Sequence, residues 1–348
     1  MQKFFIVFLA FVPIAIIAHL MQLSDTLVFF LCAVAIIPLA KFIGEATEEL
    51  SSHTNAAVGG FLNATFGNAT ELIIGVFALH AGLVEVVKAS ITGSIIGNLL
   101  LVLGTAMLLG GSRHKNQKFN LTAAQANGST LLLAVVALII PAVFLWTSHE
   151  GNAPILQELS LFVSICMILV YVASLFFAMY THKHLYTEEV GKYEARWSIK
   201  KSILILLAAT LMVSWVSEIL VGTIEAVVAQ FGWTEMFIGV IFVAIVGNIA
   251  EHVSAITVAI KNRMDLSIQI AVGSATQIIM LVAPLLVIIS WFVGPPMDLV
   301  FSTFELTAIM FSVFITNAVI ADGESNWLEG VQLIMAYVIM GIAFFFYH

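Results

Sequence analysis

Residues 59–81 read GGFLNATFGNATELIIGVFALHA, and Glu71 is the only Asp, Glu, Lys or Arg in this stretch. A helix that crosses a bilayer needs about 20 mostly apolar residues. Glu71 therefore lies near the middle of a predicted membrane span. A carboxylate at this depth costs at least about 2.5–3.5 kcal/mol on insertion scales, so the position needs a compensating role.

The same pattern returns 180 residues later, where Gly247-Asn248-Ile249-Ala250-Glu251 matches Gly67-Asn68-Ala69-Thr70-Glu71. At this offset, residues 45–102 have 12 identities in 58 positions without a gap. Apolar chains match by chance, and a duplication retained only for packing is the other alternative. The polar matches favour a functional duplication. They are Glu45 with Glu225, Asn68 with Asn248, Glu71 with Glu251, and Ser94 with Ser274.

The composition indicates an integral membrane protein. Hydrophobic residues make up 61% of the 348 residues, charged residues 10%, and the mean hydropathy is +1.07. Soluble domains carry about 25% charged residues. The net charge of −8 and the absence of a basic tract argue against a nucleic-acid partner. Cys32 and Cys166 lie in apolar runs and suggest neither a disulfide framework nor a Cys-based metal site.

Enzyme signatures are absent from the sequence. There is no H-E-x-x-H zinc motif and no G-x-x-x-x-G-K-[ST] phosphate-binding loop. We therefore expect neither an enzyme nor an ATP-driven pump, and no cofactor.

Apolar runs between polar breaks predict eleven spans. The first run is long for a signal peptide and has no prompt cleavage site, so we interpret it as a helix. The runs lie near 3–22, 27–50, 55–81, 86–110, 120–147, 155–181, 199–229, 235–260, 266–293, 299–320 and 327–347.

Lys and Arg predict the orientation of these spans. We call the membrane face that carries the N-terminus side one. Eleven Lys and Arg residues then fall in segments on side one, Lys88 alone falls on the opposite face, side two, and Lys41 lies inside a span. This bias makes side one cytoplasmic. The N-terminus is then cytoplasmic, and an odd number of spans places the C-terminus outside.

The repeat predicts the architecture. Its copies begin at spans two and seven, which are five spans apart. Because this number is odd, the second copy enters the membrane in the opposite sense. Many secondary transporters are built from such inverted repeats, with the site near the midplane. We expect an all-α polytopic membrane protein. Its parts are an N-terminal transmembrane helix (1–25), a first five-helix repeat (26–181), a cytoplasmic linker (182–198) and a second five-helix repeat (199–348).

Oxygen-bearing side chains surround the two central acids. Asn68 and Asn248 precede Glu71 and Glu251 by three residues, and so lie on the same helix faces. Carboxylate and amide oxygens suit Ca²⁺ or Mn²⁺. Gly67 and Gly247 allow a loosened backbone or a close helix approach. A second layer either adds ligands or only joins helices, as Ser and Asn commonly do in membranes. It consists of Ser94, Asn98, Ser274 and Gln277.

Other ionisable residues have weaker claims. Acidic vestibules that attract cations, or ordinary interfacial carboxylates, explain the remaining acids equally well. Two of these acids, Glu225 and Glu218, are the candidates for an additional proton carrier. His252, beside Glu251, either relays protons or packs on a neighbouring helix. The acids are Glu45, Glu48 and Glu49 at the cytoplasmic end of the second span, and Glu218 and Glu225 in the seventh.

These motifs carry a family resemblance. The stretch from Gly59 to Ile73 resembles the first signature repeat of the calcium/proton exchangers of the cation/calcium exchanger superfamily, and Gly239 to His252 resembles the second. The resemblance covers essentially the whole chain, and the short N-terminus is similar to bacterial members, which implies a bacterial plasma membrane. It implies ion binding by Glu71 and Glu251, with Asn68, Asn248 and helix carbonyls around them.

The resemblance also implies one extra helix before two five-helix halves, and trimers in some bacterial members, although the residues indicate no oligomeric state. Sodium/calcium exchangers differ in carrying a Pro-Glu version of the repeat, which is absent here. Several members have a strongly acidic segment between the halves. Residues 182–201 hold three Glu against five Lys and Arg, so we expect no acidic regulatory helix.

The predicted function is secondary antiport of Ca²⁺ against H⁺ by alternating access, with both ions competing for the paired glutamates. Membrane lipid and a divalent cation are the expected partners. Three alternatives stay open: exchange of another divalent cation such as Mn²⁺, Na⁺-coupled exchange, and a Ca²⁺-permeable channel, which requires weak multi-site binding.

Overall fold

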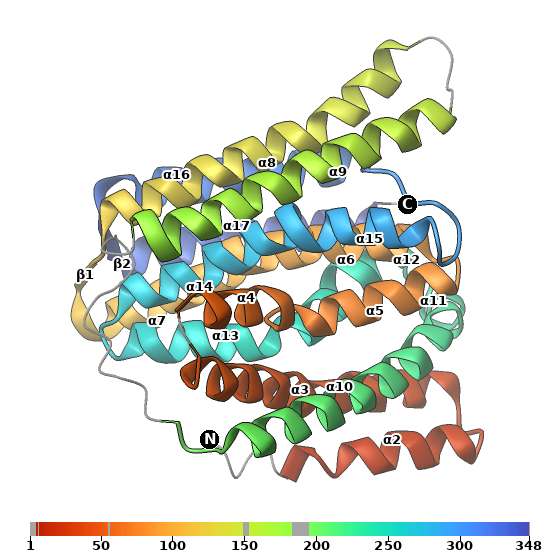
Figure 1. Cartoon of the computed structure of the whole chain (residues 1–348). Coiled ribbons are helices and arrows are strands. Elements are labelled where there is room, and N and C mark those ends of the chain that lie inside the picture. The colour runs from red at the N-terminus through yellow and green to blue at the C-terminus, as the bar shows by residue number, and fades with distance from the viewer. Residues whose placement is uncertain (1–4, 6, 55, 149–152, 183–194, 348) are drawn as a thin grey trace.

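The computed structural model describes residue 5 and residues 7–54, 56–148, 153–182 and 195–347. Helices of different lengths make up the bundle, and the longer ones run side by side (Figure 1). The helices are α2 (Phe11–Leu20), α3 (Asp25–Ser52), α4 (Ala56–Phe66), α5 (Ala69–His80), α6 (Val84–Ile96), α7 (Leu103–His114), α8 (Leu121–Thr147), α9 (Ala153–Phe176), α10 (Ile199–Gly222), α11 (Ile224–Phe231), α12 (Glu235–Phe237), α13 (Ala244–Ile260), α14 (Met264–Gln277), α15 (Ala283–Ser290), α16 (Thr303–Val319) and α17 (Trp327–Phe346).

Short π-helical turns join several of these helices into longer rods. Two of them, η1 and η5, occupy matching places in the two copies of the repeat. Adding the offset of 180 to the bounds of η1 gives residues 277–282, and η5 covers 278–282. A single-turn π-bulge inside an α-helix frequently marks a functional site. The π-helical segments are η1 (Gly97–Val102), η2 (Phe177–Thr181), η4 (Ile238–Val243) and η5 (Ile278–Val282); η6 (Ile320–Asp322) is a 3₁₀ turn.

In the described residues, nine helical rods are long and apolar enough to span a membrane. The two other predicted spans, 3–22 and 55–81, contain the shorter apolar helices Phe11–Leu20 and Ala69–His80. The helical membrane protein expected from the sequence is therefore confirmed, whereas the count of eleven spans stays a prediction. Most of the predicted linker, 182–198, lies outside the described residues, as do Glu188, Glu189 and Glu194.

The predicted span over 55–81 is interrupted at Gly67, one of the two glycines at which the sequence allows a loosened backbone. Helix α4 ends at Phe66 and α5 begins at Ala69, with Asn68 at φ −106° and ψ 32° between them. Glycine is among the weakest helix formers, so Gly67 is a low-cost place for the interruption.

The structure also adds a small β-ladder to the predicted all-α fold. Strand β1 (Asn116–Lys118) pairs antiparallel with β2 (Glu324–Asn326), with Gln117 opposite Ser325. The buried Gln117 side chain donates from Nε2 to the carbonyl oxygen of Ala259 at 2.9 Å and to Asn262 Oδ1 at 3.0 Å. These two hydrogen bonds attach the loop to the C-terminal end of α13.

Helices from the two predicted repeats interlock. Helices α2, α3 and α10 form one edge of the bundle in Figure 1, and α8 and α9 lie at the opposite edge. Glu49, near the end of α3, accepts hydrogen bonds from the backbone just before α10, and Thr26 at the start of α3 bonds to Gln230 in α11. Helices α3 and α10 therefore run antiparallel.

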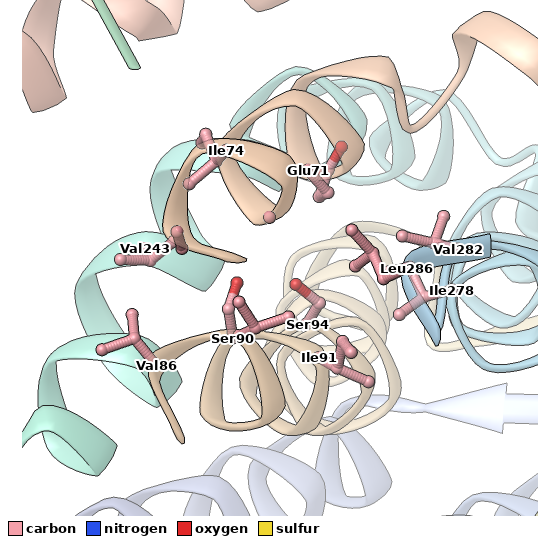
Figure 2. Close-up of a pocket in the computed structure, with 13 residues that line it drawn as sticks. Glu71, Ile74, Val86, Ser90, Ile91, Ser94, Val243, Ile278, Val282 and Leu286 are labelled. Atoms are coloured by element: carbon pink, nitrogen blue, oxygen red, sulfur yellow. The ribbon is translucent and has the colours of Figure 1, made fainter. Parts of the chain in front are cut away.

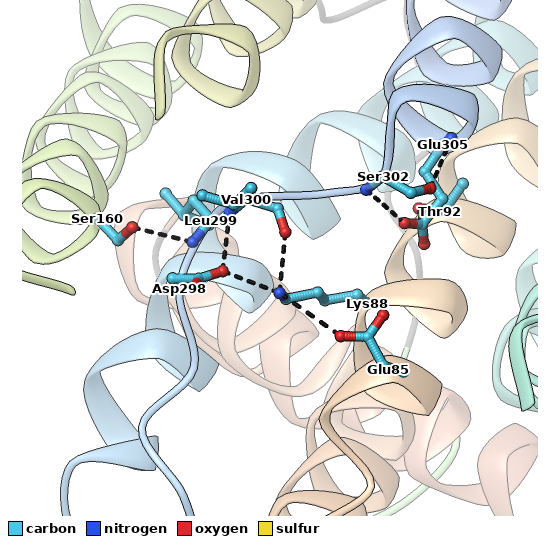
Figure 3. Close-up of polar contacts among 9 residues, drawn as sticks. All are labelled: Glu85, Lys88, Thr92, Ser160, Asp298, Leu299, Val300, Ser302 and Glu305. Atoms are coloured by element: carbon cyan, nitrogen blue, oxygen red, sulfur yellow. Dashed lines mark hydrogen bonds and ion pairs between the residues drawn. The ribbon is translucent and has the colours of Figure 1, made fainter. Parts of the chain in front are cut away.

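A buried lysine holds the loop between α15 and α16 against α6 (Figure 3). Lys88 Nζ donates to Asp298 Oδ1 and to the Val300 carbonyl oxygen, both at 2.8 Å, and lies 3.8 Å from Glu85 Oε1. Ser160 of α9 accepts from the backbone N–H of Leu299 in the same loop at 3.0 Å. Lys88 is the lone basic residue of the predicted outer face, and its charge is compensated within the protein.

Two glycines bring α6 and η4 into direct contact. A Cβ added at Gly93 would lie 2.1 Å from the Val240 carbonyl oxygen, and one added at Gly239 would lie 2.6 Å from Ala89 Cβ. The repeat-related glycines are not so placed. A Cβ at Gly273 meets nothing within 4 Å, and one at Gly59 meets Ser51 at the end of α3 and Thr54 just after it, at 3.3–3.4 Å. The two copies of the repeat thus pack differently.

Replacing Lys88 with Ala should lower stability by about 3 kcal/mol, the lower end for breaking a buried ion pair, because the Asp298 side chain is 31% exposed. Thermal unfolding in detergent measures the effect. Lys118→Ala is the control: this side chain is 82% exposed and pairs with Glu324 at 3.3 Å, so its loss should cost under about 1 kcal/mol. Equal shifts in the two variants would contradict the assignment of Lys88 as a structural clamp.

Gly93→Ala should separate α6 from η4 and destabilise the fold by about 1–3 kcal/mol, because a backbone carbonyl occupies the space of the new methyl group. The repeat-matched control, Gly273→Ala, has open space and should be neutral or stabilised by up to about 1 kcal/mol. The same unfolding assay compares them; a Gly93→Ala protein as stable as Gly273→Ala would refute the close approach.

Candidate functional site

The two signature glutamates lie next to each other in the middle of the bundle. Glu71 is in the first turn of α5, 9% exposed, and Glu251 is partly buried in α13. A Cβ added at Gly247, one turn before Glu251, would lie 3.1 Å from both Cγ and Oε1 of Glu71. Ser274, which contacts Glu251 Oε2, also contacts Asn68 Oδ1, directly before the helix that carries Glu71. The structure therefore brings the acids of both repeats to one place.

The interruption between α4 and α5 lies directly beside Glu71. It leaves Gly67 facing Gln277, whose amide atoms would lie 3.6 Å from a Cβ at Gly67. At the matching place in the second repeat, Gly247 and Asn248 lie inside the continuous helix α13. Irregular backbone at membrane depth is tolerated where it is buried in protein or lines a cavity, so the break is confined to the site.

A buried polar network links both repeats. Asn248 Nδ2 donates to Ser94 Oγ at 2.8 Å, and Asn98 Nδ2 donates to Asn248 Oδ1 at 3.1 Å and to Ser274 Oγ at 3.0 Å. Ser274 Oγ in turn contacts Asn68 Oδ1 at 3.3 Å and Glu251 Oε2. Five predicted residues thus meet Glu251 in one connected cluster, and none of the five is more than 5% exposed.

Three polar atoms in or beside this cluster have no hydrogen-bond partner in the described part of the chain. They are Glu71 Oε2, Asn98 Oδ1 and Asn68 Nδ2. A buried polar group without a partner costs about 1–3 kcal/mol, so such groups mark a place for a ligand or water. Two of the three are oxygen atoms, which suits a hard cation.

The donor set is poor in charged and soft ligands. Within the described ranges, no group of three or more His, Cys, Asp or Glu residues is arranged to hold a metal ion. Two carboxylates with neutral amide and hydroxyl oxygens therefore provide the available ligands. This combination favours Ca²⁺-like cations over thiolate- or imidazole-binding metals.

An apolar pocket extends from Glu71 along α5 toward its C-terminal end and along the N-terminal part of α6. Figure 2 shows Ile74, Val86, Val243 and Leu286 around it. Glu71, Ser90 and Ser94 supply its polar atoms. Ser90 is not among the site residues predicted from the sequence. It lies one helical turn before Ser94, and this i, i+4 spacing indicates that both side chains share a helix face.

The other predicted acids are placed away from the network. Glu45 pairs with Lys41 at 3.0 Å, and Glu48 is exposed. Glu49 differs from the expected open vestibule residue: it is 3% exposed and its Oε2 accepts from the backbone N–H groups of Arg196 and Trp197 at 2.7 and 3.0 Å. The reason is the antiparallel contact of α3 with the segment before α10.

Three further predicted residues remain without a shown role. Glu218 in α10 and Glu225 in α11 are exposed. His252 is 7% exposed, and no hydrogen bond joins it to another residue that the structure describes. A proton-carrying role for any of them stays a prediction.

The comparisons with known proteins agree along the whole chain. The family model described as "Sodium/calcium exchanger protein" matches residues 24–180 and 201–346. The chain is 50% identical over 350 residues to the Ca²⁺/H⁺ antiporter ChaA of Bacillus subtilis, with 98% of each chain covered. It is 47% identical over 364 residues to the Ca²⁺/H⁺ antiporter of Synechocystis sp., covering 99% of this chain and 98% of that one.

A solved structure shows the same fold. The structure of native YfkE has a TM-score of 0.87 and 47% identity, and the match covers 99% of this chain and all of that one. The predicted relationship to the cation/calcium exchangers is confirmed: the chain belongs to the sodium/calcium exchanger protein family.

Proposed function

We propose that this integral membrane protein is a secondary antiporter that exchanges Ca²⁺ for H⁺. The observation that carries the proposal is the meeting of Glu71 and Glu251 in a buried network with unpartnered oxygen atoms. Relatives at 47–50% identity, matched over nearly their whole length, are named Ca²⁺/H⁺ antiporters. A transporter of this kind is not an enzyme and uses no cofactor; Ca²⁺ and H⁺ are its cargo.

The two carboxylates carry either one Ca²⁺ or protons. Ca²⁺ neutralises the pair through Glu71, Glu251 and the oxygens of Asn68 and Asn98. Protons on the same carboxylates also leave the site neutral, so either cargo lets the protein change conformation. An empty site with two buried charges is costly, which opposes slippage and enforces exchange.

The repeat layout supports alternating access. The π-helical segments η1 and η5 match at the repeat offset, and α3 and α10, the first helices of the two copies, are antiparallel as an inverted duplication requires. The copies differ in conformation: Gly93 packs on η4, while Gly273 has open space. In our proposal, the two copies exchange conformations, so that the close packing moves from Gly93 to Gly273. This change would close the site on one side of the membrane and open it on the other.

The asymmetry of Lys and Arg supports a cytoplasmic N-terminus and an external C-terminus. We assign the protein to a bacterial plasma membrane, with residues 26–181 and 199–348 as the two repeats after an N-terminal helix (1–25). A homo-oligomer, such as the trimer implied by the family, is the proposed assembly.

The proton stoichiometry follows from the driving force. One pH unit provides about 1.36 kcal/mol per proton, so two protons for one Ca²⁺ support a gradient of about a hundredfold. A third proton moves one net charge and adds about 1.36 kcal/mol, plus about 2.3 kcal/mol from 100 mV. The total of about 6.4 kcal/mol sustains more than a ten-thousandfold gradient. Two carboxylates therefore suffice for modest extrusion, and Glu225 or Glu218 would carry a third proton.

Glu71→Gln and Glu251→Gln should each abolish exchange, because an amide cannot neutralise Ca²⁺ or exchange a proton. Ca²⁺ uptake by proteoliposomes, with folding checked by gel filtration, measures the loss. Glu324→Gln is the control, since Glu324 lies in the surface strand β2 and pairs with Lys118. Full exchange by either site variant would remove that residue from the site.

Everted vesicles should accumulate Ca²⁺ only with an acid interior, and a protonophore should collapse the uptake. Uptake that persists without the gradient indicates a channel, and uptake that requires Na⁺ indicates sodium coupling. Competition by Mn²⁺ in the same vesicles tests the other divalent cargo.

Transport current decides the stoichiometry in reconstituted vesicles. Two protons per Ca²⁺ predict no current and no dependence on voltage. Three protons predict one net charge per cycle and a rate that changes with membrane potential.

A further inference from the structure

One amide in the network has an orientation set by the backbone. Asn248 Nδ2 donates to the carbonyl oxygen of Ala244, one turn earlier in α13, at 2.8 Å, and to Ser94 Oγ at 2.8 Å. A carbonyl oxygen only accepts hydrogen bonds. The nitrogen of the Asn248 amide must therefore face Ala244, and its oxygen faces Asn98.

This orientation determines the next two residues. Since Asn248 Oδ1 is an acceptor, Asn98 presents Nδ2 to it at 3.1 Å, and the same nitrogen reaches Ser274 Oγ at 3.0 Å. Ser274 is thus an acceptor toward Asn98. Its hydroxyl retains one hydrogen to donate.

That single hydrogen faces two acceptors. Ser274 Oγ contacts both Asn68 Oδ1, at 3.3 Å, and Glu251 Oε2. A hydroxyl hydrogen can point straight at only one of these oxygens, and a bond shared between both is weaker. The two contacts therefore compete for the Ser274 hydrogen whenever Glu251 is a carboxylate.

A bound cation resolves the competition. A carboxylate that ligates Ca²⁺ is ionised, and a hydrogen bond to a charged acceptor is stronger than one to an amide oxygen. Ser274 then donates to Glu251. The Asn68 oxygen would then face a lone pair of the Ser274 oxygen, which is unfavourable, so the Asn68 amide rotates by half a turn. After the rotation, Nδ2 donates to Ser274. Oδ1 moves to the position that Nδ2 occupies in the structure, where Nδ2 has no partner.

The second repeat already has this turned arrangement. Ser94 and Asn248 match Ser274 and Asn68 at the repeat offset, and there the amide nitrogen donates to the serine. Asn248 is held by the Ala244 carbonyl because α13 is continuous. Asn68 lies at the break between α4 and α5 with an unpartnered Nδ2, so nothing described holds its amide in one orientation.

We propose that Ser274 is a positioning residue that turns the Asn68 amide, presenting its oxygen to the cation when Ser274 donates to Glu251. The proposal rests on the proposed function, because it requires a cation at Glu251. It assigns Ser274 an effect on Ca²⁺ affinity that acts through Asn68 and needs no contact between Ser274 and the ion.

A double-mutant cycle tests this coupling. Ca²⁺ binding to the purified full-length protein is measured by calorimetry at one alkaline pH, for the wild type and for Asn68→Ala, Ser274→Ala and both together. Asn68→Ala should raise the Kd for Ca²⁺ about tenfold when Ser274 is present. The same substitution should raise the Kd about threefold or less in the Ser274→Ala protein. Ser274→Thr keeps the hydroxyl and should retain the full effect of Asn68→Ala.

The matched control is Ser267→Ala. Ser267 is also buried in α14, two turns before Ser274, and its hydroxyl has no partner in the described residues. Asn68→Ala should weaken binding about tenfold in this background, as in the wild type. If Ser274→Ala does not fold, Ser274→Cys serves as the second hydroxyl-free variant, with the same expected loss of coupling.

Each outcome has a distinct meaning. Equal effects of Asn68→Ala with and without the Ser274 hydroxyl would overturn the proposal, because a merely structural serine gives additive losses. Failure of Ser274→Thr to restore the coupling would overturn it as well. The proposed function fails separately: it does so if Glu71→Gln and Glu251→Gln bind Ca²⁺ like the wild type.

Discussion

The structure depends on the cost of placing two carboxylates inside a membrane-embedded bundle. Glu71 and Glu251 match at the offset of 180 residues, and they lie at one site because Gly247, one turn before Glu251, faces Glu71. Two buried acids without counter-charge are expensive, and no Lys or Arg side chain forms an ion pair with either of them in the described residues. In the proposed function, the missing positive charge comes from the cargo, either Ca²⁺ or protons. The same constraint that makes the site unstable when empty makes it suited to exchange.

In the proposed function, the surrounding amides and hydroxyls respond to this changing charge. Asn and Ser side chains connect the two repeats, and their hydrogen bonds satisfy most, though not all, of their polar atoms. Side chains that could donate or accept in two ways, as Asn68 and Ser274 can, adapt to a cation that arrives and leaves. Rigid ligands with one possible hydrogen-bond pattern would favour a single state of the site.

Differences between the repeats are as informative as their similarity. Gly93 and Gly239 allow α6 to pack tightly on η4, and the rings of Phe231, Trp233 and Phe242 stack nearby, with centroids 4.6 and 5.2 Å apart. The repeat-related positions of these rings hold Ser51, His53 and Leu62, which cannot form such a stack. The segment around η4 is therefore packed by aromatic rings in a way that its repeat-related counterpart is not.

Hydropathy and the offset of 180 residues were enough to predict the helical membrane fold, the pair of acids and the residues around them, because both signals are local or periodic. Which polar atoms meet was not predictable. Ser274 and Asn68 are 206 residues apart, and their contact exists only because α14 packs beside the break in the third span. The sequence Gly-Asn occurs at 67–68 and again at 247–248, yet only the first interrupts a helix. The Gly-Asn pair alone therefore does not decide whether the helix breaks; the residues that flank it differ, and so does the packing around α4 and α5 compared with α13.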